Sequence, residues 1–278
     1  MIVNRQIRRV NDDFAGFQTL LTFFESTRNL QYADIHIQLV SFFSANMSAL
    51  LGAMLDIFST NNNITVSAQA RIQAILQKNG FLSYYGYPVI SDINNTTIPY
   101  RRFKRSDSNV FALYVNDLLN HPDFPSFTPK ARMKIAQVIM EIFINATQHT
   151  QTNYIYTCGQ FYPNKHTIDI SIVDIGGGIR NNVNSKLNSQ KSSIEAIEWA
   201  LIDGHTTKQN TPGGYGLTIL QEFLHLNGGN LQIISNDGYY CDTPKNKKTW
   251  VMCANFPGTV LNLQIRTDDN KLYRLLNE

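Results

Sequence analysis

The chain has 278 residues, of which 43% are hydrophobic and 16% charged, a balance typical of a folded globular protein with a substantial core. Its 24 Lys and Arg residues nearly balance its 21 Asp and Glu residues, giving a formal net charge of +3, which argues against nucleic acid as a partner. No apolar run approaches the ~20 residues that a membrane-spanning helix needs, so we expect no membrane partner either.

The first part of the chain alternates predicted strands and helices. β-branched and apolar residues predict a strand over 34–43, and apolar residues at helical spacing predict a helix over 45–58. A second strand is expected at 64–66 and a second helix at 68–78, ended by the Asn79-Gly80 pair. Short links between such elements indicate a parallel α/β unit.

A polar stretch without hydrophobic periodicity, residues 91–97, follows this unit. We expect a domain boundary there, which divides the chain into residues 1–96 and 97–278. In the second part the patterns predict, in chain order, a strand at 97–103, helices at 110–119 and 128–149, a strand at 167–173, helices at 194–201 and 217–226, and strands at 231–235, 249–254 and 259–265. The chain is therefore expected to be of the α/β class, with two domains.

The predicted long helix carries Glu141, Asn145 and His149 at spacing i, i+4, i+8, so their side chains share one face. A carboxylate and an amide one turn apart can act together on a bound triphosphate. The amide oxygen suits a magnesium shell, and the carboxylate can orient or deprotonate a nucleophile. Taken alone, the same pattern would also suit a solvated polar face of a helix.

The predicted strand at 167–173 runs directly into Asp174 and then into three glycines, Gly176-Gly177-Gly178. A carboxylate at the end of a buried strand needs partners, and the amino group of adenine could supply one. Glycines let the backbone approach a flat ring and adopt positive φ. A plain tight turn would explain the same residues.

A third block joins Thr206-Thr207-Lys208 to Gly214-Tyr215-Gly216-Leu217 at the start of a predicted helix. A glycine loop that leads into a helix offers N–H groups and the positive end of the helix dipole to phosphates, and Lys208 adds a charge. The block is neither a Walker loop nor a Rossmann fingerprint, because GxxxxGK[ST] is absent and no strand leads into it. Residues 180–213 are polar around one short expected helix, which is typical of a mobile lid.

Together the three blocks resemble the Bergerat-fold ATPases, which include gyrase, the ninety-kilodalton heat-shock chaperone, histidine kinases and mismatch-repair MutL. The segment from Glu141 to His149 is similar to the N box of that family, Asp174 to Ile179 to its first glycine box, and Gly214 to Leu217 to its second. Residues 206–208 resemble its lid stretch, and residues 257–263 its closing strand. The resemblance covers roughly residues 98–266. It implies a two-layer α/β sandwich, in which a mixed sheet carries helices on one face.

The resemblance also implies roles for individual residues toward ATP and Mg²⁺. Asn145 would hold the magnesium ion and Glu141 would be the general base. At the base, Asp174 would bind the adenine amino group, helped by Thr259 through a water molecule, and Gly176 and Gly178 would line the pocket of the base. The phosphates would be contacted by Gly214, Gly216 and Leu217, together with Lys208. Ile179 and Thr207 would complete the nucleotide-binding set.

The first part resembles a STAS domain of the kind found in anti-anti-sigma factors, over residues 35–58, 62–68 and 71–82. In that family a serine that follows an aspartate near a helix start accepts phosphate. Here Ala45 stands at the position of the serine, and Ser44 replaces the aspartate. The resemblance therefore implies that residues 1–96 form a degenerate STAS-like interaction module.

The leading expectation is an ATP-binding protein that hydrolyses ATP or passes its γ-phosphoryl group to a protein partner, as an anti-sigma-type serine kinase would. None of the six histidines precedes Asp or Glu, which argues against an autophosphorylating histidine kinase. The alternative is a nucleotide-gated protein-interaction module with little turnover. Related ATPases often pair, so a homodimer stays open.

Three cysteines, Cys158, Cys241 and Cys253, lie far apart and are odd in number. Their spacing suggests no zinc site. Free thiols of this kind are typical of a reducing compartment, so we expect the protein in the cytoplasm.

Overall fold

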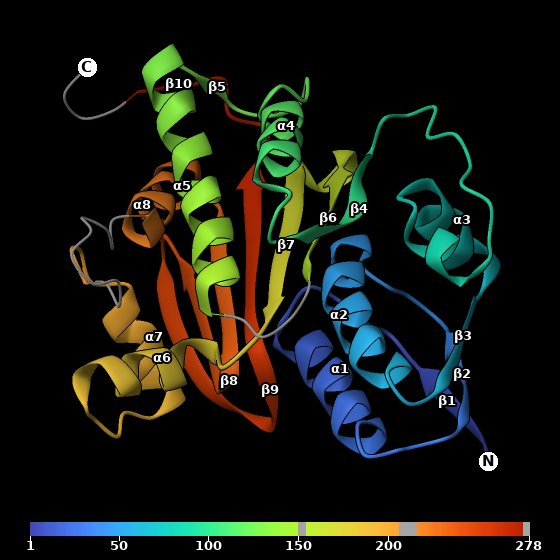
Figure 1. Cartoon of the computed structure of the whole chain (residues 1–278). Coiled ribbons are helices and arrows are strands. Elements are labelled where there is room, and N and C mark those ends of the chain that lie inside the picture. Colours follow the sequence, from blue (N-terminus) through green and yellow to red (C-terminus); the bar gives the residue numbers. More distant parts are fainter. Residues whose placement is uncertain (150–153, 206–215, 275–278) are drawn as a thin grey trace.

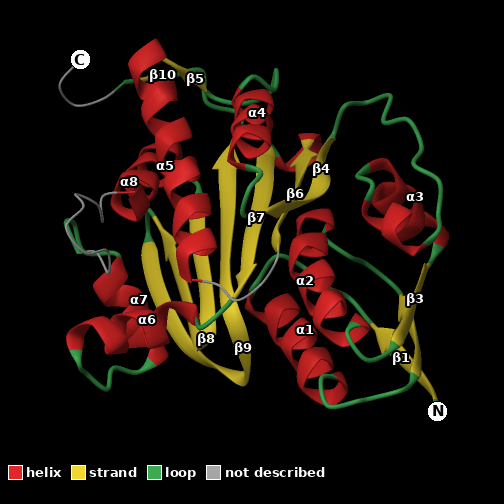
Figure 2. Cartoon of the chain, viewed as in Figure 1, coloured by secondary structure: helices red, strands yellow, loops and turns green. Residues whose placement is uncertain are grey.

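The computed structural model describes residues 1–149, 154–205 and 216–274, and it shows a mixed α/β protein (Figure 1). Helices α1 (Phe14–Thr27) and α2 (Ser48–Ser59) lie between a small sheet and a larger sheet. A second set of helices covers the other face of the larger sheet (Figure 2). The α/β class expected from the sequence is therefore confirmed.

The small sheet belongs to the first part of the chain and is entirely parallel. Its strands, in spatial order, are β1 (Ile2–Ile7), β2 (Asp34–Leu39) and β3 (Asn63–Ala68). The elements expected over 34–78 occur as β2, α2, β3 and α3 (Ala70–Lys78), so the parallel α/β unit is confirmed. The patterns missed β1 and α1, although Asp13 caps α1 by accepting a hydrogen bond of 2.9 Å from the N–H of Gly16.

The larger sheet has five strands. In spatial order they are β4 (Thr97–Lys104), β6 (Tyr154–Tyr162), β7 (Thr167–Ile175), β9 (Asn246–Arg266) and β8 (Asn230–Thr243). Every neighbouring pair of described strands in this larger sheet is antiparallel, so the expected mixed sheet is wrong in this detail. Short turns join β6 to β7 and β8 to β9, and such turns connect only antiparallel neighbours. The strands expected at 249–254 and 259–265 are one continuous strand, β9.

The helices on the outer face of the larger sheet are α4 (Ser108–Leu119), α5 (Pro129–His149) and α8 (Gly216–Asn227), close to their predicted bounds. The alternation of β7 explains which layer each residue meets. Ile170 and Ile172 pack into the core under α4 and α5, whereas Val173 and Ile175 pack into the core around α1 and α2. Asp174 therefore falls on the α5 side of the sheet.

One hydrophobic core spans the expected domain boundary. Side chains of the larger sheet, such as Val173 and Phe256, belong to the same buried cluster as Phe24 of α1, and the Phe24 and Phe256 ring centroids are 6.1 Å apart. Polar contacts cross the boundary too: the amide of Asn46 donates a hydrogen bond of 2.9 Å to Asn262 Oδ1. The division into 1–96 and 97–278 stays a prediction, and the two parts pack as one body through this shared core.

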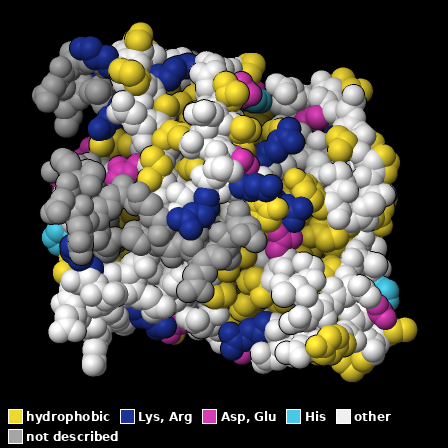
Figure 3. Space-filling view, viewed as in Figure 1, with side chains coloured by type: hydrophobic (Ala, Val, Ile, Leu, Met, Phe, Trp, Pro, Cys, Tyr) yellow, Lys and Arg dark blue, Asp and Glu magenta, His cyan; other side chains and the backbone are white. Residues whose placement is uncertain are grey.

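The surface carries no single dominant charged region on the face drawn in Figure 3, where Lys and Arg side chains lie in separate small groups. Among the described residues, no helix combines the length and the apolar character needed to cross a bilayer.

Candidate functional site

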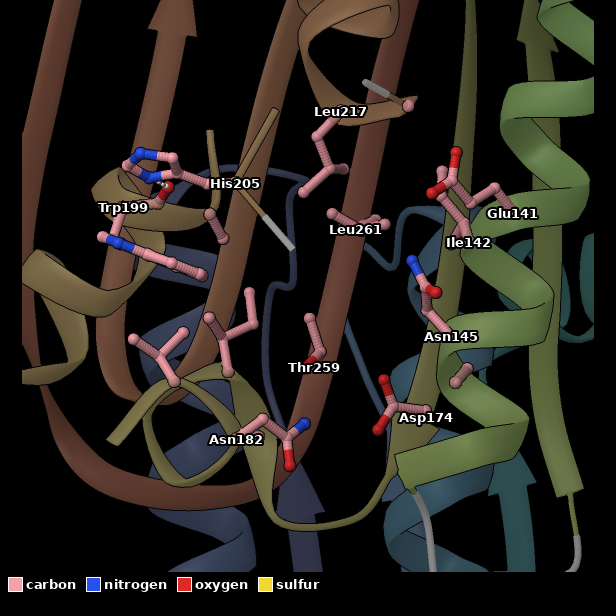
Figure 4. Close-up of a pocket in the computed structure, with 16 residues that line it drawn as sticks. Glu141, Ile142, Asn145, Asp174, Asn182, Trp199, His205, Leu217, Thr259 and Leu261 are labelled. Carbon is pink, nitrogen blue, oxygen red and sulfur yellow. Dashed lines mark hydrogen bonds between the residues drawn. The ribbon is translucent and has the colours of Figure 1, made fainter. Parts of the chain in front are cut away.

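A cleft opens between α5, the end of β7, the interior part of β9 around Thr259, and the helices α6 (Gly178–Leu187), α7 (Ser193–Ala200) and α8 (Figure 4). Its cavity of about 150 Å³ has room for roughly ten water molecules at about 10–15 Å³ each. Eight of the twelve predicted site residues line it: Glu141, Asn145, Asp174, Gly178, Ile179, Gly216, Leu217 and Thr259. The fold thus brings together residues of all three sequence blocks and of the expected closing strand.

The other four predicted residues are placed differently. Gly176 does not line the cleft: its N–H donates a hydrogen bond of 2.9 Å to the carbonyl of Pro257, which extends the pairing of β7 with β9. Thr207, Lys208 and Gly214 lie outside the described residues, and so does the part of the expected lid beyond residue 205. Between residues 180 and 205 the expected lid contains helix α7 and most of helix α6, where one short helix was expected.

The polar face of α5 points into the cleft, and Figure 4 shows Glu141 and Asn145 one turn apart on it. The opposite face, with Val138, Ile139 and Phe143, is buried in the core. The Oδ1 atom of Asn145 is buried and has no hydrogen-bond partner among the described residues. Because an unpaired buried amide oxygen is costly, a donor or a cation supplied by a ligand would stabilise this position.

Asp174 lies opposite Thr259 in the β7–β9 ladder. Both the backbone N–H and the hydroxyl of Thr259 donate hydrogen bonds to its carboxylate, yet burial outweighs them and raises the pKa of Asp174 to about 7. A carboxyl group with a raised pKa that faces a cleft is a candidate for ligand binding. An ionised carboxylate has room for a further donor, such as an amino group.

The start of α6 is fixed by close contacts with β8. Gly178 has φ +72°, and a Cβ there would lie 2.4 Å from Asn236 Oδ1, so only glycine suits this position. Asn236 in turn donates a hydrogen bond of 3.1 Å to the carbonyl of Gly177, and the N–H of Ile179 donates one of 2.7 Å to Ser235 Oγ. These contacts fix the position of the start of α6, which forms one side of the cleft.

The first residue of α8 approaches the polar face of α5 closely. A Cβ on Gly216 would lie 2.8 Å from Glu141 Oε2, so the glycine lets the start of α8 come up to the carboxylate. The cleft therefore brings a carboxylate, an amide oxygen and the beginning of a helix together on one side. Such a combination suits a ligand that carries phosphates and a metal ion.

Among the lining residues that the sequence patterns missed, three have side chains with polar groups: Asn182, Trp199 and His205. The rings of Trp199 and His205 are in contact, with centroids 4.7 Å apart, and His205 Nδ1 lies 3.1 Å from the carbonyl oxygen of Trp199. No motif marks any of the three. Only the start of α7 carries a local signal, the capping box that Ser192 forms with Glu195.

No family model matches the chain, and no curated protein matches it. Within the described part of the chain, no group of three or more His, Cys, Asp or Glu side chains could hold a metal ion. A magnesium ion at this cleft would therefore take most of its ligands from water and from the phosphates of its nucleotide, as magnesium commonly does.

Proposed function

We propose that the protein binds ATP with Mg²⁺ in this cleft, and that it hydrolyses the ATP or passes its γ-phosphoryl group to a protein partner. In this proposal residues 97–278 form an ATP-binding domain of the Bergerat type. The observation that supports it best is the convergence of Asn145, Asp174 and the start of α8 on one cleft. These residues are far apart in the sequence, and neither helix packing nor strand pairing requires that their polar groups meet.

Magnesium fits the donor set that the chain offers. The buried, unpaired Oδ1 of Asn145 is a hard oxygen ligand of the kind that magnesium prefers. A bound metal ion would neutralise charge on the triphosphate. The chain itself would supply the position of the nucleotide, through Asp174 at the base end and through Gly216 and Leu217 at the phosphate end.

Glu141 is the proposed general base. It lies one turn before Asn145 on the same helix face and beside the first residue of α8. From there a carboxylate could take the proton of an attacking water, or of a hydroxyl group on a partner protein, as the new bond to phosphorus forms. The same position serves hydrolysis and transfer, so the acceptor decides between them.

Residues 1–96 are proposed to act as a STAS-like interaction module. Ser44 and Ala45 are each 1% exposed, where they lie against the larger sheet. A partner protein that binds at Ser44 and Ala45 would have to displace the contact of this segment with the larger sheet. A cytoplasmic location agrees with three cysteines that form no disulfide.

The test is to incubate the protein with magnesium and γ-labelled ATP and to follow the label. Label in free phosphate identifies an ATPase, and label on a second protein identifies a kinase. Tight ATP binding with all label left on ATP would favour the alternative, a nucleotide-gated interaction module. Calorimetry that detects no binding of ATP, with or without magnesium, would reject the proposed function.

A further inference from the structure

The polar groups around Asp174 are suited to accept hydrogen bonds from a base but not to complete its recognition. Both donors of Thr259 are directed at the Asp174 carboxylate, so this pair presents acceptors to the amino group of an adenine. The ring nitrogens beside that amino group are themselves acceptors. A ring nitrogen that is enclosed without a donor weakens binding, so a site for adenine needs a second contact.

Asn182 is in the right place to provide it. Residues Gly178, Ile179, Asn182 and Val183 line the cleft as one face of α6. Figure 4 shows the amide of Asn182 at the same end of the cleft as Asp174 and Thr259. Among the described residues, the carboxamide of Asn182 has no hydrogen-bond partner, and a carboxamide offers both a donor and an acceptor.

The position of Asn182 is fixed by the start of its helix. Gly178 and Ile179 are held against β8 by the contacts with Asn236 and Ser235, and Asn182 follows Gly178 by one turn of the same helix. A side chain on a rigid, well-anchored element can contribute specificity, whereas one on a free loop contributes less. The polar neighbours Asn181 and Asn184 differ from it, because neither lines the cleft.

We infer that Asn182 is a second base-reading residue of this site: its amide donates a hydrogen bond to a ring nitrogen of a 6-aminopurine whose amino group is held by Asp174. This inference rests on the proposed function and deepens it. The ligand class is narrowed to adenine nucleotides, with a contact to N1 or N7, the two ring nitrogens that flank the amino-bearing side of the base. A base with a carbonyl at that place would meet the acceptor of Asp174 with an acceptor of its own.

The experiment compares Asn182→Ala with the matched control Asn181→Ala, which removes an exposed asparagine from the same helix. Both variants should melt like the wild type, because alanine favours a helix more than asparagine does. We expect Asn182→Ala to weaken ATP binding about 3- to 10-fold, the effect of one hydrogen bond. Asn181→Ala should leave it unchanged within about twofold. The titration is then repeated with 1-deaza-ATP and 7-deaza-ATP.

The analogue that lacks the contacted nitrogen should bind equally to Asn182→Ala and to the wild type, which would support the contact and identify the atom. If Asn182→Ala binds ATP as tightly as the control, or if its loss persists with both analogues, the inference is overturned while the proposed function stands. If the wild type binds no adenine nucleotide, the proposed function fails as well. The two failures are therefore distinct.

Discussion

Replacing Asp174 by asparagine should make the folded protein more stable at neutral pH and at the same time weaken its binding of ATP. Stability and ATP affinity are expected to change in opposite directions because the environment of Asp174 disfavours its charged form. Burial raises its pKa from 3.8 to about 7 even though Thr259 donates hydrogen bonds to it, so the fold disfavours the ionised form. Asparagine has nearly the same shape without the charge.

The size of the stability effect follows from proton linkage. A group whose folded pKa is raised binds more protons when folded, so wild-type stability falls as pH rises from about 4 to about 7. About three pKa units correspond to an upper bound of ~4 kcal/mol at about 1.36 kcal/mol each. Water in the cleft and the loss of one hydrogen bond from Thr259, worth ~1 kcal/mol, reduce the expected gain for Asp174→Asn to roughly 1–3 kcal/mol at pH 8. At about 2–4 °C per kcal/mol, this is a rise of several degrees in Tm.

The binding effect has a separate cause. Thr259 already directs two donors at position 174, so an amide there must turn its NH₂ group either toward a donor of Thr259 or toward the adenine amino group. The loss of a hydrogen bond to a charged group, ~1.5–3 kcal/mol, should weaken ATP binding roughly 10- to 150-fold. The assays are thermal melts at pH 5 and pH 8 and calorimetry with ATP. A variant that is less stable than the wild type at pH 8, or that keeps full ATP affinity, would refute the reasoning.

Three further variants test other features of the structure, two in the cleft and one on the opposite face of the larger sheet. Glu141→Ala should keep ATP affinity within about threefold while steady-state phosphate release falls ~10²-fold or more; unchanged turnover would place the base elsewhere. Asn145→Ala should abolish the gain in nucleotide affinity that magnesium provides, because Asn145 Oδ1 is the proposed magnesium ligand. The measurement is a nucleotide titration in the presence of magnesium or of a chelator. A magnesium effect as large as in the wild type would contradict that role. Burial and the nearby Asp12 carboxylate raise the pKa of Asp169 to about 8, so wild-type stability should fall as pH rises from about 4 to about 8, and Asp169→Asn should remove that part of the fall in melts at pH 6 and pH 9. The same pH dependence in both proteins would show that Asp169 is not its source.

Local sequence patterns predicted the elements whose apolar residues follow a clear periodicity or form a continuous run. The α5 helix has a clear apolar stripe opposite Glu141 and Asn145, and β7 is an apolar run that ends at Asp174, so both were found close to their observed bounds. β6 was missed because it is buried on both faces and shows no alternation. α6 was missed because its sequence, GIRNNVNSKL, has few apolar positions, and its start is fixed by Ser235 and Asn236 from a distant strand.

The residues of the candidate site also divide into those that a local sequence pattern predicted and those that no local pattern indicated. Glu141, Asn145, Asp174 and Gly216 lie in short motifs whose order can be read along the chain, and they line one cleft. Asn182, Trp199 and His205 line the same cleft without any motif. Their presence depends on how α6 and α7 pack against β8, and packing between elements distant in sequence leaves no local pattern.

The shared core leads to a last prediction, on the independence of the two parts of the chain. A fragment of residues 97–278 would expose the face of the larger sheet that α1 and α2 cover. That face includes large side chains that are at most 5% exposed in the whole chain, among them Tyr156, Ile234, Tyr239, Met252 and Phe256. At ~1.5–3 kcal/mol for each buried side chain, losing their cover removes up to roughly 7–15 kcal/mol, which is comparable to the entire stability of a typical domain.

We therefore expect the fragment 97–278 to aggregate or to melt without cooperativity when it is produced alone, and to be rescued when residues 1–96 are produced with it as a separate chain. The measurements are size-exclusion chromatography and thermal melts of the fragment, of the two-chain mixture and of the intact protein. In the mixture, Phe24→Asp should prevent rescue, because Phe24 contacts Phe256 across the shared core and a charge buried there has no partner. Gln38→Asp is the matched control, since Gln38 lies on the exposed face of the small sheet. A monomeric fragment that melts cooperatively on its own would show that the larger sheet is stable without its α1 and α2 cover, and residues 1–96 would then be an accessory unit that can leave residues 97–278 without unfolding them.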